Sequence, residues 1–151
     1  MGYVGAARAP VDCVFCEALA ASDDRKSLVL RRREHAFLIL NTYPYTPGHL
    51  MAVVNRHVGM LTDATADELG AAMELVRLAV LILTDEYRAE GFNIGLNQGR
   101  VAGAGITDHL HVHVVPRWNG DTNFMPVLGE TKVINEHLAR SWQELSRAFS
   151  A

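Results

Sequence analysis

The stretch that decides the fold reads His109-Leu110-His111-Val112-His113-Val114-Val115. Successive side chains of a β-strand point to opposite faces, so the histidines share one face and the aliphatic residues between them point into a core. Histidine is a weak strand former with a polar ring, and a row of them has no packing role of its own. A solvated face is the plain alternative, and the regular spacing favours a row that does chemistry.

Two chemistries suit such a row. A neutral imidazole can attack phosphorus while a neighbouring ring orients it or passes a proton. Alternatively, two or three imidazoles can bind a metal ion, as in many sites that contain alternate histidines. The row by itself leaves both possibilities open.

Hydrophobic periodicity and turn residues outline the rest of the chain. They predict strands at residues 28–32, 35–41, 49–55, 92–98 and 109–118 and helices at 12–20 and 135–149. A capping box of Thr65 and Glu68 starts a long helix that we expect to end at Gly91. The expected apolar stripe of this helix consists of Leu69, Met73, Val76, Val80, Leu83 and Tyr87.

This order of elements predicts an α+β fold, with a mostly antiparallel sheet, one long helix and a C-terminal helix. We expect residues 1–11 to form a flexible arm and residues 12–151 to form a single domain. Hydrophobic residues make up 49% of the chain, charged residues 21%, and the net charge is −3. The negative charge argues against a nucleic-acid partner but leaves room for a small phosphorylated ligand. No stretch is typical of a membrane span or a signal peptide, so we expect a soluble, cytoplasmic protein.

The histidine row resembles the signature of the histidine-triad family of nucleotide hydrolases and transferases. The resemblance extends from Cys13 to about Val127 and includes Asn41, the pair Gly48-His49 and Gln98. The tail from Arg117 to Pro126 resembles a bacterial branch of the family that includes diadenosine tetraphosphate phosphorylases. The family's fold, a HIT-like α+β fold, agrees with the order of elements expected from periodicity.

The resemblance implies roles for particular residues. It makes His111 the nucleophile that attacks the α-phosphorus of an adenine nucleotide or dinucleoside polyphosphate and forms a nucleotidyl-histidine intermediate. His113 and His49 would assist beside it, Asn41 would contact the ribose, and Gln98 would contact the phosphate or the leaving group. The resemblance also suggests a homodimer built along the long helix and the strand at 92–98.

One position departs from the family pattern. Many members carry Gln-Ser or Gln-Thr where this chain has Gly105 and Ile106. Thr107 and nearby backbone N–H groups are the expected substitutes for the missing side-chain donor. Backbone N–H groups in the loop of Gly103 and Gly105 are also expected to cradle inorganic phosphate as the acceptor.

Cys13 and Cys16 form a C-x-x-C pair, which makes half of a tetrahedral zinc site. His57 and His109 could complete it, and the zinc-containing members of the family use this set in the same order. With four protein ligands the zinc would be structural. Two buried thiols or a redox dithiol are the alternatives to this interpretation.

Other interpretations stay open beside the phosphorolysis of diadenosine tetraphosphate that the resemblance implies. The chain could instead be a hydrolase of dinucleoside polyphosphates or nucleoside phosphoramidates, or a nucleotide-binding regulatory module with little turnover. The metal could also be catalytic on the histidine row. Phe15 is a candidate for contact with the base. The basic run Arg31-Arg32-Arg33 is expected to be a solvated face.

Overall fold

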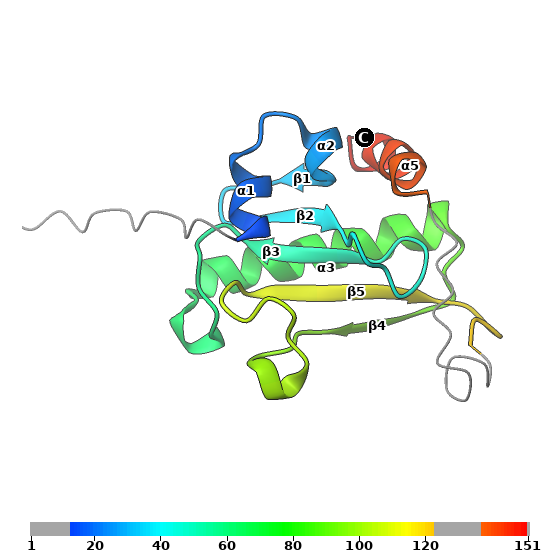
Figure 1. Cartoon of the computed structure of the whole chain (residues 1–151). Coiled ribbons are helices and arrows are strands. Elements are labelled where there is room, and N and C mark those ends of the chain that lie inside the picture. Colours follow the sequence, from blue (N-terminus) through cyan, green and yellow to red (C-terminus); the bar gives the residue numbers. More distant parts are fainter. Residues whose placement is uncertain (1–12, 123–136, 151) are drawn as a thin grey trace, which may run out of the picture.

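The molecule is built on one antiparallel sheet (Figure 1). The computed structural model describes residues 13–122 and 137–150. Within these residues the sheet has the strand order β1-β2-β3-β5-β4. The strands are β1 (Val29–Arg32), β2 (Ala36–Leu40), β3 (Leu50–Val54), β4 (Gly91–Gly95) and β5 (His111–Arg117). The helices are α1 (Val14–Ala20), α2 (Asp24–Ser27), α3 (Ala66–Glu86) and α5 (Leu138–Ser150), with 3-10 turns η1 (Leu61–Asp63) and η2 (Arg100–Ala102).

The α+β architecture expected from the sequence is therefore confirmed. The expected arm at residues 1–11 lies outside the described residues, as do the first residues of the C-terminal helix expected at 135. No helix in the described ranges is both long enough and apolar enough to cross a membrane.

The long helix α3 starts as predicted and ends earlier than predicted. The Thr65 hydroxyl accepts a bond from the Glu68 backbone N–H, and the Glu68 carboxylate accepts one from the Thr65 N–H. The helix ends at Glu86, and Gly91 instead begins β4, so the predicted end is wrong. Arg88, just after the helix, has a left-handed backbone with φ 52°. Glycine is the residue most often found at this position after a helix.

Most of the predicted stripe of α3 is confirmed, since Val76 and Leu83 are buried and Leu69, Val80 and Tyr87 pack against the core. Met73 is the exception, at 53% exposed, and the helix also buries Ala72, Leu75 and Ala79. The small side chains of Ala72 and Ala79 suit a helix that lies close to the sheet. The helix packs against β2, β3 and β5, while α5 packs against β1 and α3 (Figure 1).

Two hydrophobic clusters lie on opposite faces of the sheet. The cluster on the α3 face includes Leu110, Val112 and Val114. The cluster on the α1 face includes Phe15 of α1, Phe37 and Ile39 of β2, and Met51 and Val53 of β3. Strands β2 and β3 are thus buried on both faces, which explains their nearly continuous apolar sequences.

Gly48 lets the chain pass close to α3 just before it enters β3. Its φ is +78°, and a Cβ there would lie 2.9 Å from Leu83 Cδ2 and 3.0 Å from the Tyr87 ring. Glycine supplies both the left-handed backbone and the close approach to α3. The next residue, His49, is consequently held directly before β3 with no exposed surface.

Candidate functional site

The histidine row lies on the α1 face of the sheet. His111 pairs with Val53 and His113 pairs with Met51 across β5 and β3, and both partners belong to the α1-side cluster. The intervening Leu110, Val112 and Val114 lie in the α3-side core, as the alternation predicts. His109 precedes the first residue of β5 but is almost completely buried.

Hydrogen bonding determines which nitrogen of His111 carries the proton. Its Nδ1 lies 2.7 Å from the carbonyl oxygen of His109, and a carbonyl can only accept. Nδ1–H therefore donates this bond, and Nε2 of the neutral ring keeps its lone pair. The Phe15 ring packs on the His111 ring at a centroid distance of 4.9 Å, which limits rotation of the imidazole.

His49 and His113 form a relay whose polarity is set by the backbone. The Tyr45 N–H donates to His49 Nδ1 over 3.1 Å, so the neutral His49 ring carries its proton on Nε2. That Nε2 lies 3.0 Å from His113 Nδ1 and donates to it. His113 is left with its own proton on Nε2, as a donor available to a ligand.

The environment favours neutral rings in all three catalytic candidates. Burial lowers the pKa of His49 from 6.5 to about 3, with His113 and then His111 adding to the shift. Burial also lowers the pKa of His111, although its bond to the His109 carbonyl opposes the shift. The pKa of His113 is lowered by burial and by the nearby His111. A neutral His111 beside a neutral donor is the state that nucleophilic attack on phosphorus requires.

A cavity of about 1040 Å³ opens in front of His111 and His113. The apolar residues of its lining include Val14, Phe15, Ala18, Ile39, Leu40 and Met51. Its polar residues and glycines include Asn41, Asn97, Gly103 and Gly105. A lining with a broad apolar part and a few polar groups is typical of small-molecule sites.

Only some of the residues expected to bind substrate line this cavity. Asn41 and Gly105 do so. Asn41 Oδ1 accepts a bond from the Tyr43 N–H, which turns its Nδ2 toward the His49 ring. The side-chain amide oxygen of Gln98 accepts a bond from the Leu61 N–H, and the Thr107 hydroxyl donates to the Asp108 carboxylate. Neither residue lines the cavity.

Asn97 occupies the cavity wall where sequence reasoning expected Gln98. The two neighbouring side chains point in different directions in the loop after β4, since Asn97 lines the cavity and the Gln98 amide oxygen binds the Leu61 N–H. The sequence shows two neighbouring amide residues, Asn97 and Gln98, but it does not show which of the two side chains faces the cavity.

Four candidate metal ligands also meet. Atoms of Cys13, Cys16, His57 and His109 that could bind a metal lie within 4.8 Å of one another. His109 Nδ1 is 3.3 Å from Cys13 Sγ and 3.5 Å from Cys16 Sγ, and His57 Nδ1 is 3.4 Å from Cys16 Sγ. Ligands around a tetrahedral zinc ion are separated by about 3.3 to 3.8 Å, given its usual bond lengths. The donor set and its spacing therefore fit a metal ion.

A second contact of His109 supports this assignment. Its Nε2 lies 2.7 Å from the Val54 carbonyl, so Nε2–H donates there and the Nδ1 lone pair faces the thiols. Metal-binding histidines commonly donate their other N–H in this way. His109 thus belongs to the cysteine cluster, while His111 and His113 belong to the cavity.

Comparisons with known proteins agree with this geometry. Residues 23–120 match the family model described as the HIT domain. AP-4-A phosphorylase of Mycobacterium tuberculosis is 45% identical over 115 residues, which cover 76% of this chain and 59% of that protein. The chain thus matches little more than half the length of this curated relative.

Two further proteins extend the comparison. The asymmetrical bis(5'-nucleosyl)-tetraphosphatase of Schizosaccharomyces pombe is 33% identical over 95 residues, covering 63% of this chain and 52% of that protein. A crystal structure of a Zn-bound histidine triad family protein from Mycobacterium smegmatis superposes with a TM-score of 0.74 at 26% identity. This superposition covers 91% of this chain and 93% of that one.

Proposed function

Because this chain belongs to the HIT family, we propose that it is an enzyme that cleaves the α-phosphate linkage of adenine dinucleotides through His111. The observation that carries the proposal is the His111 ring itself. Its Nδ1 is occupied by a backbone carbonyl, its pKa is lowered by burial, and the ring lines a cavity large enough for a nucleotide.

In the proposed first step, His111 Nε2 attacks the α-phosphorus. An N–P bond forms as the bond to the bridging oxygen breaks, and the electron pair leaves with that oxygen. His113 Nε2–H is the donor available to a phosphate oxygen, and His49 holds the His113 ring by donating to its Nδ1. From diadenosine tetraphosphate, the leaving group is adenosine triphosphate.

In the proposed second step, an acceptor oxygen attacks the same phosphorus and the N–P bond breaks, which returns His111 to its starting state. Inorganic phosphate as the acceptor gives adenosine diphosphate, and water gives adenosine monophosphate. We favour phosphate, because the chain is similar to a phosphorylase and because Gly103 and Gly105 line the cavity with backbone that no side chain covers.

The two kinds of lining residue suggest how the nucleotide lies. The apolar lining residues, which include Phe15 and Ile39, suit a nucleobase, and Asn41 would contact the ribose. Gly105 and Asn97 line the same cavity as His111 and His113 and would contact phosphate. Gln98 and Thr107 would act on the loop rather than on the ligand, given their bonds to Leu61 and Asp108.

We also propose that Cys13, Cys16, His57 and His109 hold zinc. The ion would supply a closed structural cross-link between the start of α1, the segment after β3 and His109, which lies two residues before β5. A homodimer, as the resemblance suggests, would use the exposed apolar residues Ile94 of the edge strand β4 and Met73 and Leu81 of α3.

Product analysis tests the function. The protein is incubated with diadenosine tetraphosphate over a range of inorganic phosphate concentrations, and the nucleotides are separated. We expect adenosine di- and triphosphate, at a rate that rises with phosphate. Adenosine monophosphate at a phosphate-independent rate would favour the second candidate, a hydrolase like the S. pombe relative.

Two variants test the role of His111. His111→Asn should lower turnover by several orders of magnitude while adenosine monophosphate still binds. His35→Asn is the matched control, because His35 is a partly exposed histidine outside the cavity. Turnover by His111→Asn at the rate of the control would overturn the assignment of the nucleophile. Binding without turnover in the wild-type protein would favour a regulatory module.

A further inference from the structure

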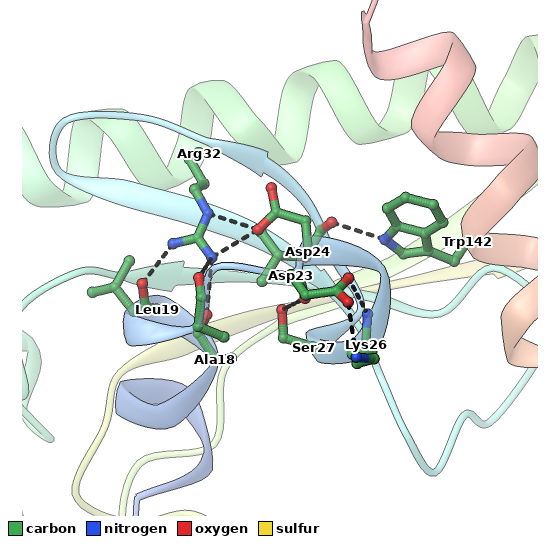
Figure 2. Close-up of polar contacts among 10 residues, drawn as sticks. Ala18, Leu19, Asp23, Asp24, Lys26, Ser27, Arg32 and Trp142 are labelled. Atoms are coloured by element: carbon green, nitrogen blue, oxygen red, sulfur yellow. Dashed lines mark hydrogen bonds and ion pairs between the residues drawn. The ribbon is translucent and has the colours of Figure 1, made fainter.

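Two residues of the basic run, Arg31 and Arg32 of β1, do not form the solvated face expected of them, whereas Arg33 after the strand is exposed. Arg31 and Arg32 point to opposite sides of the strand and each reaches a different helix. Arg31 donates to the Phe149 carbonyl of α5. Arg32 lies on the α1 side, where its guanidinium is the centre of a polar cluster (Figure 2).

The Arg32 cluster joins the end of α1 to the start of α2. Its Nη1 donates to the Leu19 carbonyl over 2.6 Å, and Nη2 donates to the carbonyls of Ala18 and Ala21 over 3.0 and 3.1 Å. Nε and Nη2 donate to Asp24 Oδ1 over 2.9 and 2.8 Å. These carbonyls belong to the last turn of α1 and to its C-cap, Ala21, where a positive charge also interacts favourably with the helix dipole.

The segment that Arg32 holds is a wall of the cavity. Ala18, Ala21, Ser22, Asp23, Lys26 and Ser27 all line it. Arg32 itself does not line the cavity, so its influence on a ligand must pass through the backbone that it binds. Within the segment, Asp23 caps α2 by accepting a bond from the Lys26 N–H, so the position of α2 follows from that of the loop (Figure 2).

We propose that Arg32 is a positioning residue that sets this wall of the cavity and thereby the affinity for the nucleoside part of the substrate. This inference rests on the proposed function and adds to it a determinant outside the histidine row. A planar fork of five N–H donors can bind three carbonyls and a carboxylate at once, whereas a lysine ammonium offers three donors from a single point.

The effect should be confined to binding because the two ends of α1 are held independently. The first turn is anchored by Phe15, which is 1% exposed and packs on His111, and by the contacts of Cys13 and Cys16 with His109. Loss of Arg32 releases the last turn and the loop that follows. The catalytic rings on β5 and beside β3 keep their own hydrogen bonds.

The test compares Arg32 with Arg31, since the two arginines are neighbours on one strand and each binds a helix. Arg32→Met, Arg32→Lys and Arg31→Met are each measured for KM and kcat with diadenosine tetraphosphate, Kd for adenosine monophosphate, and Tm. We expect Arg32→Met to raise KM and Kd about tenfold, equivalent to about 1.4 kcal/mol, with kcat changed by less than about twofold. Arg32→Lys should restore only part of the affinity, and Arg31→Met should lower Tm without changing KM.

Asp24→Asn provides a second route if Arg32→Met does not fold, because it weakens the same cluster from the partly exposed side. It should raise KM and Kd in the same direction by a smaller factor. Equal KM values for the Arg32 and Arg31 variants, or a loss of kcat without a change in KM, would overturn the inference while the proposed function stands. A wild-type protein that neither binds nor cleaves adenine nucleotides would overturn both.

Discussion

The protein should become less stable in mild acid because the folded state resists protonation of His49, and the size of the effect follows from the burial of that ring. The ring has no exposed surface, and its pKa falls from 6.5 to about 3 because burial, then His113 and His111, oppose a charge there. Since the folded-state pKa lies below the unfolded-state value, the unfolded chain binds the proton first. The full stability is therefore present above the unfolded pKa and is lost as the pH falls through 6.5 toward 3.

The magnitude can be worked out for a convenient range. Between about pH 8 and about pH 5 the unfolded chain takes up a proton on this ring and the folded chain does not, which lowers the free energy of unfolding by about 2 kcal/mol. Urea unfolding of the wild-type protein and of His49→Asn at several pH values measures the effect. The variant is less stable throughout, but its stability should fall by about 2 kcal/mol less over this range.

The comparison isolates His49 because other acid-sensitive groups, including the cysteine cluster, are common to both proteins. If the two proteins lose stability in parallel over this range, His49 has an ordinary pKa and the argument from burial is wrong. The same burial that causes acid sensitivity keeps the relay from His49 to His113 neutral, so the test also examines the state required for catalysis.

Three further results are expected. Elemental analysis should find about one zinc ion per chain, and Cys13→Ser should lower Tm more than it lowers the specific activity of the folded protein; a metal-free protein of equal stability would contradict the assignment. Glu68→Gln should cost about 1 kcal/mol of stability, measured by urea unfolding, because it weakens both the capping box and the bond to a half-exposed Arg56. Arg56 and the Thr65 N–H hold the pKa of Glu68 at about 2, so the wild-type advantage over this variant should disappear as the pH falls from 4.5 toward 2, and a constant advantage would count against it. Gly105→Val should weaken the stimulation of turnover by phosphate more than it weakens binding of adenosine monophosphate, and equal losses would remove the phosphate site from this loop.

Features that depend on backbone geometry within one segment could be predicted from the sequence. Alternation along a strand is enough to separate His111 and His113 from the core residues Val112 and Val114. The capping box of Thr65 and Glu68 is equally local, and both of its hydrogen bonds are present. The grouping of Cys13, Cys16, His57 and His109 was reached only through the resemblance to a family, because these residues lie far apart in the sequence.

Features that depend on how separate segments meet were decided by the tertiary structure. Met73 is exposed and Ala72 is buried, although helical spacing gives most of the buried face of α3, because contact with the sheet decides which residues at the edge of that face are covered. Asn97 lines the cavity and Gln98 does not, because the path of the loop after β4 turns the Gln98 side chain to the Leu61 N–H. The site of the proton on His113 depends on the backbone N–H of Tyr45, which binds His49 Nδ1 and so makes His49 Nε2–H the donor to His113 Nδ1.

Arg32 shows both what local sequence determines and what the tertiary structure decides. Alternation on β1 sends Arg31 and Arg32 to opposite faces, and this much is local. Whether the guanidinium meets solvent or three carbonyls depends on where α1 ends above the strand. Local sequence determines the direction of a side chain, and only packing between distant segments determines what it meets there.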